Sequence, residues 1–599
     1  MTGVQTCALP IYSVLIDEAQ IPMIISQRRG SEADVKKDRE LFPKINQIVN
    51  LLEKDRDFKI NLKKQTIFLT IEGISKVEKI LGVKNLYAEE KENHLYYLER
   101  LLKAHHFFKK DKDYIVDEKE AIIVDEFTGR LMFGHRFFQG VHQAIEAKEG
   151  LPINEEDETL ASITYQHFFR KYKNFCGLTG TAKTAEKELK MIYGKKVFVV
   201  PTNKPIARQD LKDKFFLRWE DKLRHLAWEI EEHYLRERPV LVGTRSILKS
   251  QQVQNLLVAE NIPSSVLNAK NTPREAEIIA QAGRAKTVTV ATNMAGRGTD
   301  ILVDEVARGV GGMVVYGLER HNARRIDDQL IGRSGRQGDP GQSVFLISAE
   351  DELIKNYFLK EYQTVFLASH QDSQKGLESG KLEKILRKAQ KRMEEVFFDQ
   401  RLLGYEFDKA MEKQRNAFYR QRERVLKDES LKEETLNLIK LELARKLLGR
   451  FSLKKIFEKN EWEEIQRKAA ELVGNAWFKP RKISEKKLSL VQAKKILYED
   501  IASYYQDFEN FYSPEKTRLV EKTVTLKVLD LMWRENLKKA EIAQSEALVE
   551  SLSREDFFYR YERKMFQNYQ SMFLAIPEIL VKTFLRTLNR LCKTDGKKI

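Results

Sequence analysis

The sequence contains few cysteines and no long apolar run. Cys7, Cys176 and Cys592 are the only cysteines in 599 residues, and no two of them form a CxxC pair. Isolated cysteines are typical of a reducing compartment, and they exclude a cysteine-rich zinc site. No apolar stretch is long enough to span a bilayer, so we expect any membrane association to be peripheral.

A phosphate-binding loop is also missing. No G-x-x-x-x-G-K-[ST] pattern occurs, and the Gly-Lys pairs that are present lack a following Ser or Thr. In P-loop enzymes this loop holds the phosphates of the nucleotide. Its absence excludes a complete ATP site of that kind within these residues.

Proline and glycine are scarce in the last third of the chain. From Lys381 to Ile599 there are three prolines (480, 514 and 577) and four glycines (404, 449, 474 and 596). This composition predicts long helices. One helical stripe there consists of Leu526, Leu529, Trp533 and Leu537. Such a stripe is more often a core face than a partner groove.

Charge, in contrast, is abundant. Lys and Arg number 105 and Asp and Glu number 89, which gives a net charge of +16. An acidic partner such as anionic lipid or nucleic acid is therefore expected, and charge alone does not choose between them. The length predicts roughly three to five domains.

A strand followed by glycines and an arginine stands between Thr287 and Ile301. The β-branched run from Thr287 to Ala291 predicts a buried strand. The sequence Gly296-Arg297-Gly298 follows it, and glycines let the backbone approach a ligand closely.

A second Gly/Arg segment runs from Gln329 to Asp339 and contains Arg333 and Arg336. If this segment is helical, the two arginines share a face and both point at one anion. Two such segments within 50 residues favour a phosphate site. The alternative is a solvated basic helix with turn glycines.

These two segments resemble the last two motifs of the helicase-like motor core. They are similar to the form of these motifs found in SecA, the family of preprotein translocase ATPases. The resemblance covers nearly everything after residue 12. Other matching segments, in chain order, are 122–130, 142–149, 159–166, 178–182, 199–203, 239–244 and 267–270.

The resemblance implies an α/β helicase-like motor with parallel sheets, an inserted α+β preprotein-binding domain and an all-α helical scaffold and wing. The expected divisions are 1–12 non-native, 13–27 and 151–205 nucleotide-binding domain 1, 28–150 preprotein-binding domain, 206–370 nucleotide-binding domain 2, 371–429 scaffold, 430–515 wing and 516–599 scaffold with a two-helix finger.

Residue patterns inside these divisions give more local expectations. Strands at Val240–Val242 and Val288–Val290, with a helix at Ser246–Ala259, are typical of a parallel sheet. Within 28–150, Thr66–Thr70 and Tyr114–Val124 read as strands. A helical stripe there comprises Leu41, Ile45, Ile48, Leu51 and Leu52.

This insert has two interpretations. An exposed strand edge suits a clamp that holds unfolded polypeptide by backbone pairing. The patterns alone equally fit an ordinary α+β insert.

The resemblance also assigns site residues. It implies arginine fingers at Arg333 and Arg336, which stabilise charge on a transferring phosphoryl group. Residues near the nucleotide would be Gly296, Arg297, Gly298, Asp300 and Gln337. Coupling between lobes would involve Thr179, Gly180 and Thr181.

Two acidic pairs, Asp17-Glu18 and Asp125-Glu126, each follow a short apolar run, as magnesium-binding acids do at the end of a strand. We expect neither to be catalytic, because each matches a different part of the family pattern. The family's magnesium acids lie a few residues before Asp17-Glu18, and in this sequence those positions are either missing or replaced by Ile11-Tyr12. We therefore expect a chain that begins inside nucleotide-binding domain 1, uses ATP and Mg²⁺ with an incomplete site, binds no zinc and is inactive alone.

Two positions depart from the family pattern, and the first is expected to weaken a contact. Ile331 stands where an arginine is common, and Leu552 stands near the usual tyrosine of the finger tip. With no cysteine-rich zinc tail, the sequence is similar to accessory-type members that serve a restricted set of exported proteins.

The implied function is preprotein translocation across the bacterial plasma membrane. The expected partners are a SecY-type channel, unfolded preproteins, anionic phospholipids and a second copy in a homodimer. The expected location is cytoplasmic, peripheral on the cytoplasmic face of the membrane. The alternative is a nucleic-acid helicase of the same superfamily. The insert and helical tail favour translocation, and no zinc finger or RRM signature favours nucleic acid as a partner.

Overall fold

A computed structural model gives the structure of the chain. It describes residues 8–9, 15–16, 18–28, 32–61, 66–83, 86, 94–124, 131–137, 140–155, 157–267, 275–292, 300–369, 376–428, 430–449, 456–474, 478–481, 487–550 and 557–594. The chain forms two compact units. The first comprises 1–22, 26–158 and 164–403, and the second comprises 23–25, 159–163 and 404–599.

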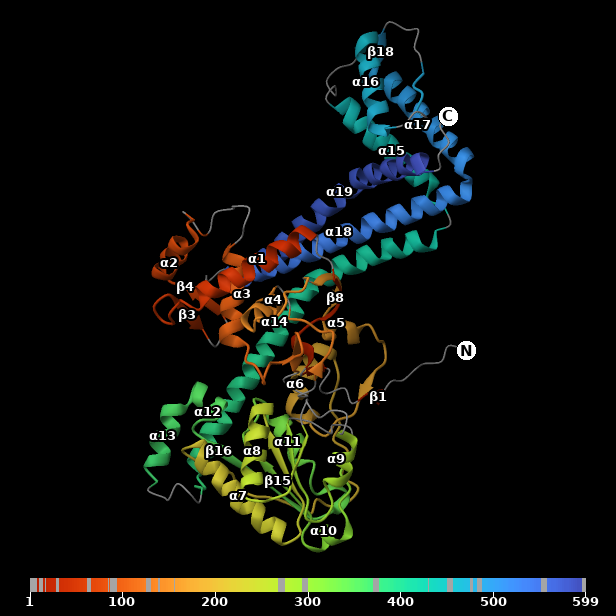
Figure 1. Ribbon diagram of the computed structural model, residues 1–599. Helices are drawn as coiled ribbons and strands as arrows, with labels where there is room; N and C mark the ends of the chain where they lie inside the picture. Colours follow the sequence, from red (N-terminus) through yellow and green to blue (C-terminus); the bar gives the residue numbers. More distant parts are fainter. Residues whose placement is uncertain are drawn as a thin grey trace. The chain divides into compact units, whose positions relative to one another are not determined.

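Among the described residues, seven strands between Arg208 and Ser348 form a parallel sheet (Figure 1). Its path is β10-β16-β15-β12-β14-β13, and β11 pairs with the later half of β16. The strands are β10 (Arg208–Asp210), β11 (Lys214–Phe216), β12 (Val240–Thr244), β13 (Ser265–Leu267), β14 (Val288–Thr292), β15 (Met313–Gly317) and β16 (Gly341–Ser348).

Helices cover both faces of this sheet, because successive side chains of a strand point to opposite sides. Val240 and Val242 pack in one hydrophobic cluster with residues of α7 and α8, whereas Leu241 packs in another with residues of α9 and α10. The helices are α7 (Trp219–Leu235), α8 (Ile247–Ala259), α9 (Glu275–Gln281), α10 (Glu305–Gly309) and α11 (Arg324–Ile331). The predicted parallel α/β fold is confirmed.

The start of α8 follows from its cap. Ser246 has extended backbone, and its hydroxyl accepts a hydrogen bond from the backbone N of Lys249 at 3.2 Å. This satisfies one of the free N–H groups at the helix start. The predicted helix from Ser246 to Ala259 is therefore confirmed, with Ser246 as its N-cap.

The insert is a mixed α and β region. Its elements are α1 (Glu32–Val49), β3 (Phe58–Asn61), β4 (Thr66–Leu69), α2 (Ile71–Leu81), α3 (His94–Phe107), β5 (Tyr114–Asp117), β6 (Glu120–Val124), β7 (Leu131–Met132) and α4 (Val141–Lys148). Among the described residues β3 pairs antiparallel with β4, and β5, β6 and β7 form a second antiparallel sheet.

The helical stripe predicted in the insert needs one correction. Leu41, Ile45 and Ile48 of α1 are buried as expected. Leu51 is 59% exposed and lies beyond the end of the helix, so it does not belong to the buried face. Leu52 also follows the helix and packs against the insert core from a loop.

The segment between the insert and the sheet contains short strands and short helices. It contains β8 (Asp157–Ile163), which pairs with β2 (Met23–Arg28), and β9 (Cys176–Gly177), which pairs with β1 (Ala8–Leu9). Its helical elements are α5 (Tyr165–Arg170), η3 (Ala182–Ala185) and α6 (Glu186–Tyr193). Glu188 of α6 makes a buried ion pair with Arg401 at 2.7 Å.

Two short helices, α12 (Glu352–Tyr357) and α13 (Leu359–Leu367), follow the sheet. The long helix α14 (Gly380–Lys427) comes next, and the two units divide within it. The second unit adds α15 (Lys432–Leu448), β17 (Ile456–Glu458), α16 (Lys459–Val473), β18 (Lys487–Ser489), α17 (Leu490–Tyr512), α18 (Pro514–Glu550) and α19 (Phe557–Thr594). The predicted helical region is confirmed.

Helices α18 and α19 lie side by side (Figure 1). Leu529, Trp533 and Leu537 are buried as the stripe predicted, and Leu526 is only half-buried. No helix in the described part of the chain is long and apolar enough to cross a membrane.

Candidate functional site

The loop that follows α11 carries Arg333 and Arg336. Helix α11 ends at Ile331, so Arg333 lies just outside it and Arg336 begins a separate short 3-10 turn. The expectation that both arginines share one helical face is therefore wrong. Gly335 between them has a φ of 69°, a left-handed conformation that an α-helix does not contain.

The loop joins the two Gly/Arg segments found in the sequence. The Arg336 guanidinium donates from Nη1 to the carboxylate of Asp300 at 2.5 Å and from Nε to the carbonyl of Gly332 at 2.9 Å. The Arg336 side chain is 37% exposed and the Asp300 side chain 55%. An arginine held by a half-exposed carboxylate remains accessible to a phosphate, which accepts from a guanidinium in the same geometry.

Arg208 anchors this loop from the edge strand β10. Its Nη1 donates to the carbonyl of Ser334 at 3.1 Å, and its Nε pairs with Asp210 at 2.6 Å. The Ser334 hydroxyl is buried and donates to the carbonyl of Met313 on β15 at 2.7 Å. The loop is thus fixed to two strands of the sheet.

Helix α11 carries a buried carboxylate, that of Asp327, which holds the helix in place through hydrogen bonds. Asp327 accepts from the backbone N of His321 at 2.8 Å, from Gln390 Nε2 at 2.7 Å and from Arg320 Nη1 at 3.5 Å. Burial raises the pKa of Asp327 to about 7, although Arg320 acts in the opposite direction. Because Gln390 belongs to α14, this network connects α11 to that long helix.

The predicted coupling segment contacts α11 as well. The Thr181 hydroxyl lies 3.4 Å from Nε2 of Gln329, which stands on α11 two residues before its end. The Thr181 backbone N donates to the Thr179 hydroxyl at 3.2 Å. Gly180 between them faces open space. A displacement of this segment would therefore act on the helix that leads into the arginine loop.

Other predicted residues are placed as follows. Gln337 is exposed in the turn after Arg336, with a left-handed φ of 51°. Ile331 packs at the edge of the core that contains Phe345 of β16. The residues Gly296, Arg297 and Gly298, and Leu552 of the finger tip, lie outside the described residues.

The acidic pairs are only partly described. Asp17, Asp125 and Glu126 lie outside the described residues. The carbonyl of Leu15 accepts from the Tyr193 hydroxyl at 2.8 Å, and both residues are buried. Within the described ranges, no three His, Cys, Asp or Glu side chains come together in a way that could hold a metal ion.

Several residues of the site were not predicted. Gln329 begins the segment that carries the arginines, and Asp327 lies two residues before it. Both are polar residues on a helix that also has buried positions, which could have indicated a role. Arg208 and Gln390 stand in segments without a motif, 126 and 63 residues from their partners Ser334 and Asp327. No sequence signal indicates those contacts.

Three family models match the chain. Residues 37–146 match the SecA preprotein cross-linking domain, and residues 376–588 match the SecA Wing and Scaffold domain. The SecA P-loop domain matches in two overlapping parts, 205–308 and 303–372.

Curated relatives agree with these models. The chain is 39% identical to the "Protein translocase subunit SecA" of Nitratiruptor sp.. The alignment covers 96% of this chain and 66% of that protein. It is 39% identical to the subunit of the same name from Thermosipho melanesiensis, over 97% of the chain and 65% of that protein. The Halothermothrix orenii subunit is 38% identical over 96% of the chain and 67% of that protein. The chain thus spans about two thirds of the length of these relatives, and it belongs to the SecA family.

Proposed function

We propose that this chain supplies the preprotein-handling part and the arginine-bearing lobe of a motor that couples ATP hydrolysis to preprotein translocation. The preproteins would be unfolded and would pass through a SecY-type channel. The observation that carries the proposal is the contact of Arg336 with Asp300, since it places a guanidinium where two Gly/Arg segments meet. The relatives, named translocase subunits, support the same activity.

In this proposal Arg333 and Arg336 stabilise the negative charge that develops on the phosphoryl group of ATP. The nucleotide replaces Asp300 as the partner of Arg336. The described residues do not form a magnesium site, so no step is assigned to the metal. ATP would be held by Gly296, Arg297 and Gly298 together with a phosphate-binding loop that the 599 residues do not contain.

Movement would pass through α11. The Thr181 hydroxyl contacts Gln329 on one side of this helix, and Gln390 of α14 contacts Asp327. A change in nucleotide contact at the arginine loop would shift α11 between these two partners. This gives the coupling residues Thr179, Gly180 and Thr181 a physical route to the scaffold.

ATP turnover tests the proposal. We expect background hydrolysis from the 599 residues alone, and hydrolysis when they are part of a longer polypeptide that has a phosphate-binding loop. In that polypeptide Arg333→Ala or Arg336→Ala should each reduce turnover on the order of a thousandfold. Arg236→Ala is the matched control, since Arg236 is also an exposed arginine in an ion pair of the same domain.

The stimulating partner distinguishes translocase from helicase. Unfolded preprotein with anionic vesicles and channel should raise turnover, whereas RNA should not. Stimulation by RNA alone would contradict the proposal. Magnesium-dependent turnover by the 599 residues alone would show that one of the acidic pairs is catalytic after all.

A further inference from the structure

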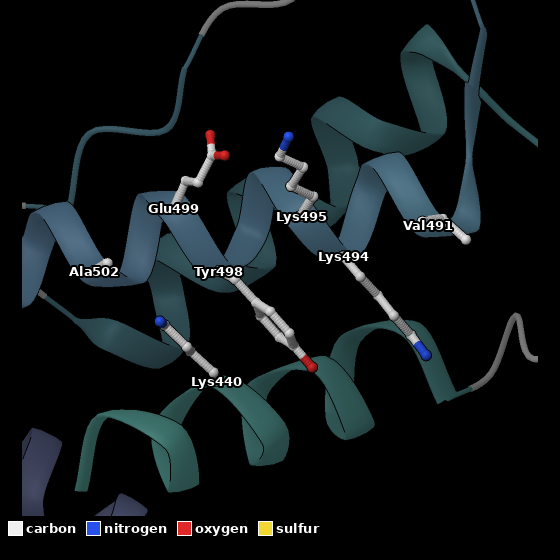
Figure 2. Close-up of a pocket in the computed structure, with 7 residues that line it drawn as sticks. All are labelled: Lys440, Val491, Lys494, Lys495, Tyr498, Glu499 and Ala502. Carbon is white, nitrogen blue, oxygen red and sulfur yellow. The ribbon is translucent and has the colours of Figure 1, made fainter. Parts of the chain in front are cut away.

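A hollow of about 390 Å³ lies between α15 and α17 of the second unit (Figure 2). Its volume is within the range of small-ligand sites. We call it the wing hollow, and it is lined by Lys440 of α15 and by Val491, Lys494, Lys495, Tyr498, Glu499 and Ala502 of α17.

The wing hollow carries uncompensated positive charge. In the part of the chain that the structure describes, no carboxylate lies within ion-pair distance of Lys440, Lys494 or Lys495. Glu499 is the one acidic residue of the lining, and it pairs with Arg481 outside the hollow at 2.7 Å. Two ammonium groups, those of Lys440 and Lys494, therefore extend into the space, and the one carboxylate of the lining is paired elsewhere.

The side chains are arranged to receive a ligand that is partly apolar. In Figure 2, Lys440, Lys494 and Tyr498 extend into the space between the two helices, whereas Lys495 and Glu499 point away from α15. Val491 is 77% exposed at the rim. The lysine stems, the tyrosine ring and Val491 form an apolar wall, and the charges and the hydroxyl stand along it.

We propose that the wing hollow binds a phosphate-bearing ligand with a short apolar arm. Ammonium groups are common phosphate partners, and the Tyr498 hydroxyl provides a further donor. A peptide of glutamates would supply carboxylates on a flexible backbone but no separate apolar group for the wall formed by Val491 and Tyr498. The phosphate could come from a phospholipid head group at a membrane surface or from a soluble phosphate ester.

Vesicle binding by the complete chain without nucleotide tests the lipid source. The variant Lys440→Gln/Lys494→Gln/Lys495→Gln is compared with Lys459→Gln/Arg467→Gln/Lys468→Gln on α16, which removes the same charge from the same wing. We expect the first variant to bind phosphatidylglycerol-containing vesicles on the order of tenfold more weakly than the second, because a lysine close to the head groups contributes more than a distant one.

Glycerol 3-phosphate and inorganic phosphate, measured by calorimetry, test the soluble source. Binding of either that is lost in the hollow variant supports the proposal with a soluble ligand. Hollow-dependent binding to vesicles alone supports it with a lipid. A Lys→Arg triple variant should retain binding in both cases, and unchanged thermal unfolding shows that the variants fold.

Equal losses in the hollow and control variants, with no binding of soluble phosphate, would overturn the proposal, because general charge would then explain the affinity. Competition by a glutamate peptide as effective as that by glycerol 3-phosphate would overturn it too. The assay contains no nucleotide, preprotein or channel, so its failure leaves the proposed motor function unaffected.

Discussion

At the scale of single residues, the arginine loop depends on Gly335. Its φ is 69°, and an added Cβ would lie 2.4 Å from the Cβ of Arg208. A side chain at this position is therefore strained by its backbone conformation and collides with the residue that anchors the loop. Both effects displace the segment that carries Arg333 and Arg336.

We expect Gly335→Ala to destabilise the first unit by about 1–3 kcal/mol. Gly180→Ala is the control, since Gly180 has no positive φ and faces open space. Thermal unfolding followed by circular dichroism measures both. Equal midpoints for the two variants would show that the loop adapts to a side chain at position 335.

Asp327 gives a prediction about pH. Its pKa in the folded protein is about 7 because it is buried, whereas an unfolded aspartate has a pKa of about 4. Between these values the folded state binds more protons than the unfolded state. The stability contributed by this residue therefore falls as pH rises through this window and is constant above it.

We expect the wild-type chain to lose more stability than Asp327→Asn between pH 5 and pH 8, by on the order of a few kcal/mol. Urea unfolding at each pH measures the difference, and the exposed substitution Asp117→Asn is the control. If the stability of the wild type and of Asp327→Asn changed equally with pH, the raised pKa of Asp327 would be contradicted.

At the scale of elements, the long helices of the second unit pack through aromatic side chains. Trp533 of α18 is 2% exposed, and its ring stacks on Phe418 of α14 with centroids 4.6 Å apart and planes at 11°. Stacked pairs of this kind contribute beyond the area they bury. The contact holds α18 against α14 at the helical turns that contain Trp533 and Phe418.

Trp533→Ala should therefore destabilise the second unit by about 3–5 kcal/mol, since it leaves a large cavity between helices. Trp533→Phe should cost much less because it keeps a ring there. Leu519→Ala changes an exposed residue of the same helix and should be nearly neutral. The measurement is the urea midpoint of the helical signal, and a similar midpoint for Trp533→Ala and Leu519→Ala would refute the role of the stack.

At the scale of the whole molecule, the insert has a strand edge that pairs with no other strand of the described residues. Within the described residues β4 pairs only with β3, and Phe68 on it is 40% exposed. An extended chain pairs with such an edge through its backbone, so the sequence of the cargo matters little. This property suits the proposed role of residues 28–150 as a clamp for preproteins.

A photo-crosslinking residue at position 68 of the complete chain should form adducts with an unfolded export precursor and none with the folded form. The same probe at Leu235, an exposed position of α7, should give few adducts. Yields at position 68 that do not exceed those with a charge-scrambled peptide would refute the clamp.

The sequence by itself determined the local elements and the family. The strand Val240–Thr244 follows from a short apolar run with β-branched residues, and the helix that starts after Ser246 follows from a capping side chain. These features act within a few residues of the chain. The Gly/Arg segments and the matching stretches around them identified SecA, because such motifs are contiguous in the chain.

Only the tertiary structure decided which residues of the site meet. The partners Asp300 and Arg336 are 36 residues apart, and Thr181 and Gln329 are 148 apart. It also decided that Arg333 and Arg336 do not share a helix, since Gly335 between them has a left-handed conformation and lies against Arg208 of β10. Local propensity carries no information about such contacts, because they form only when the sheet brings distant segments together.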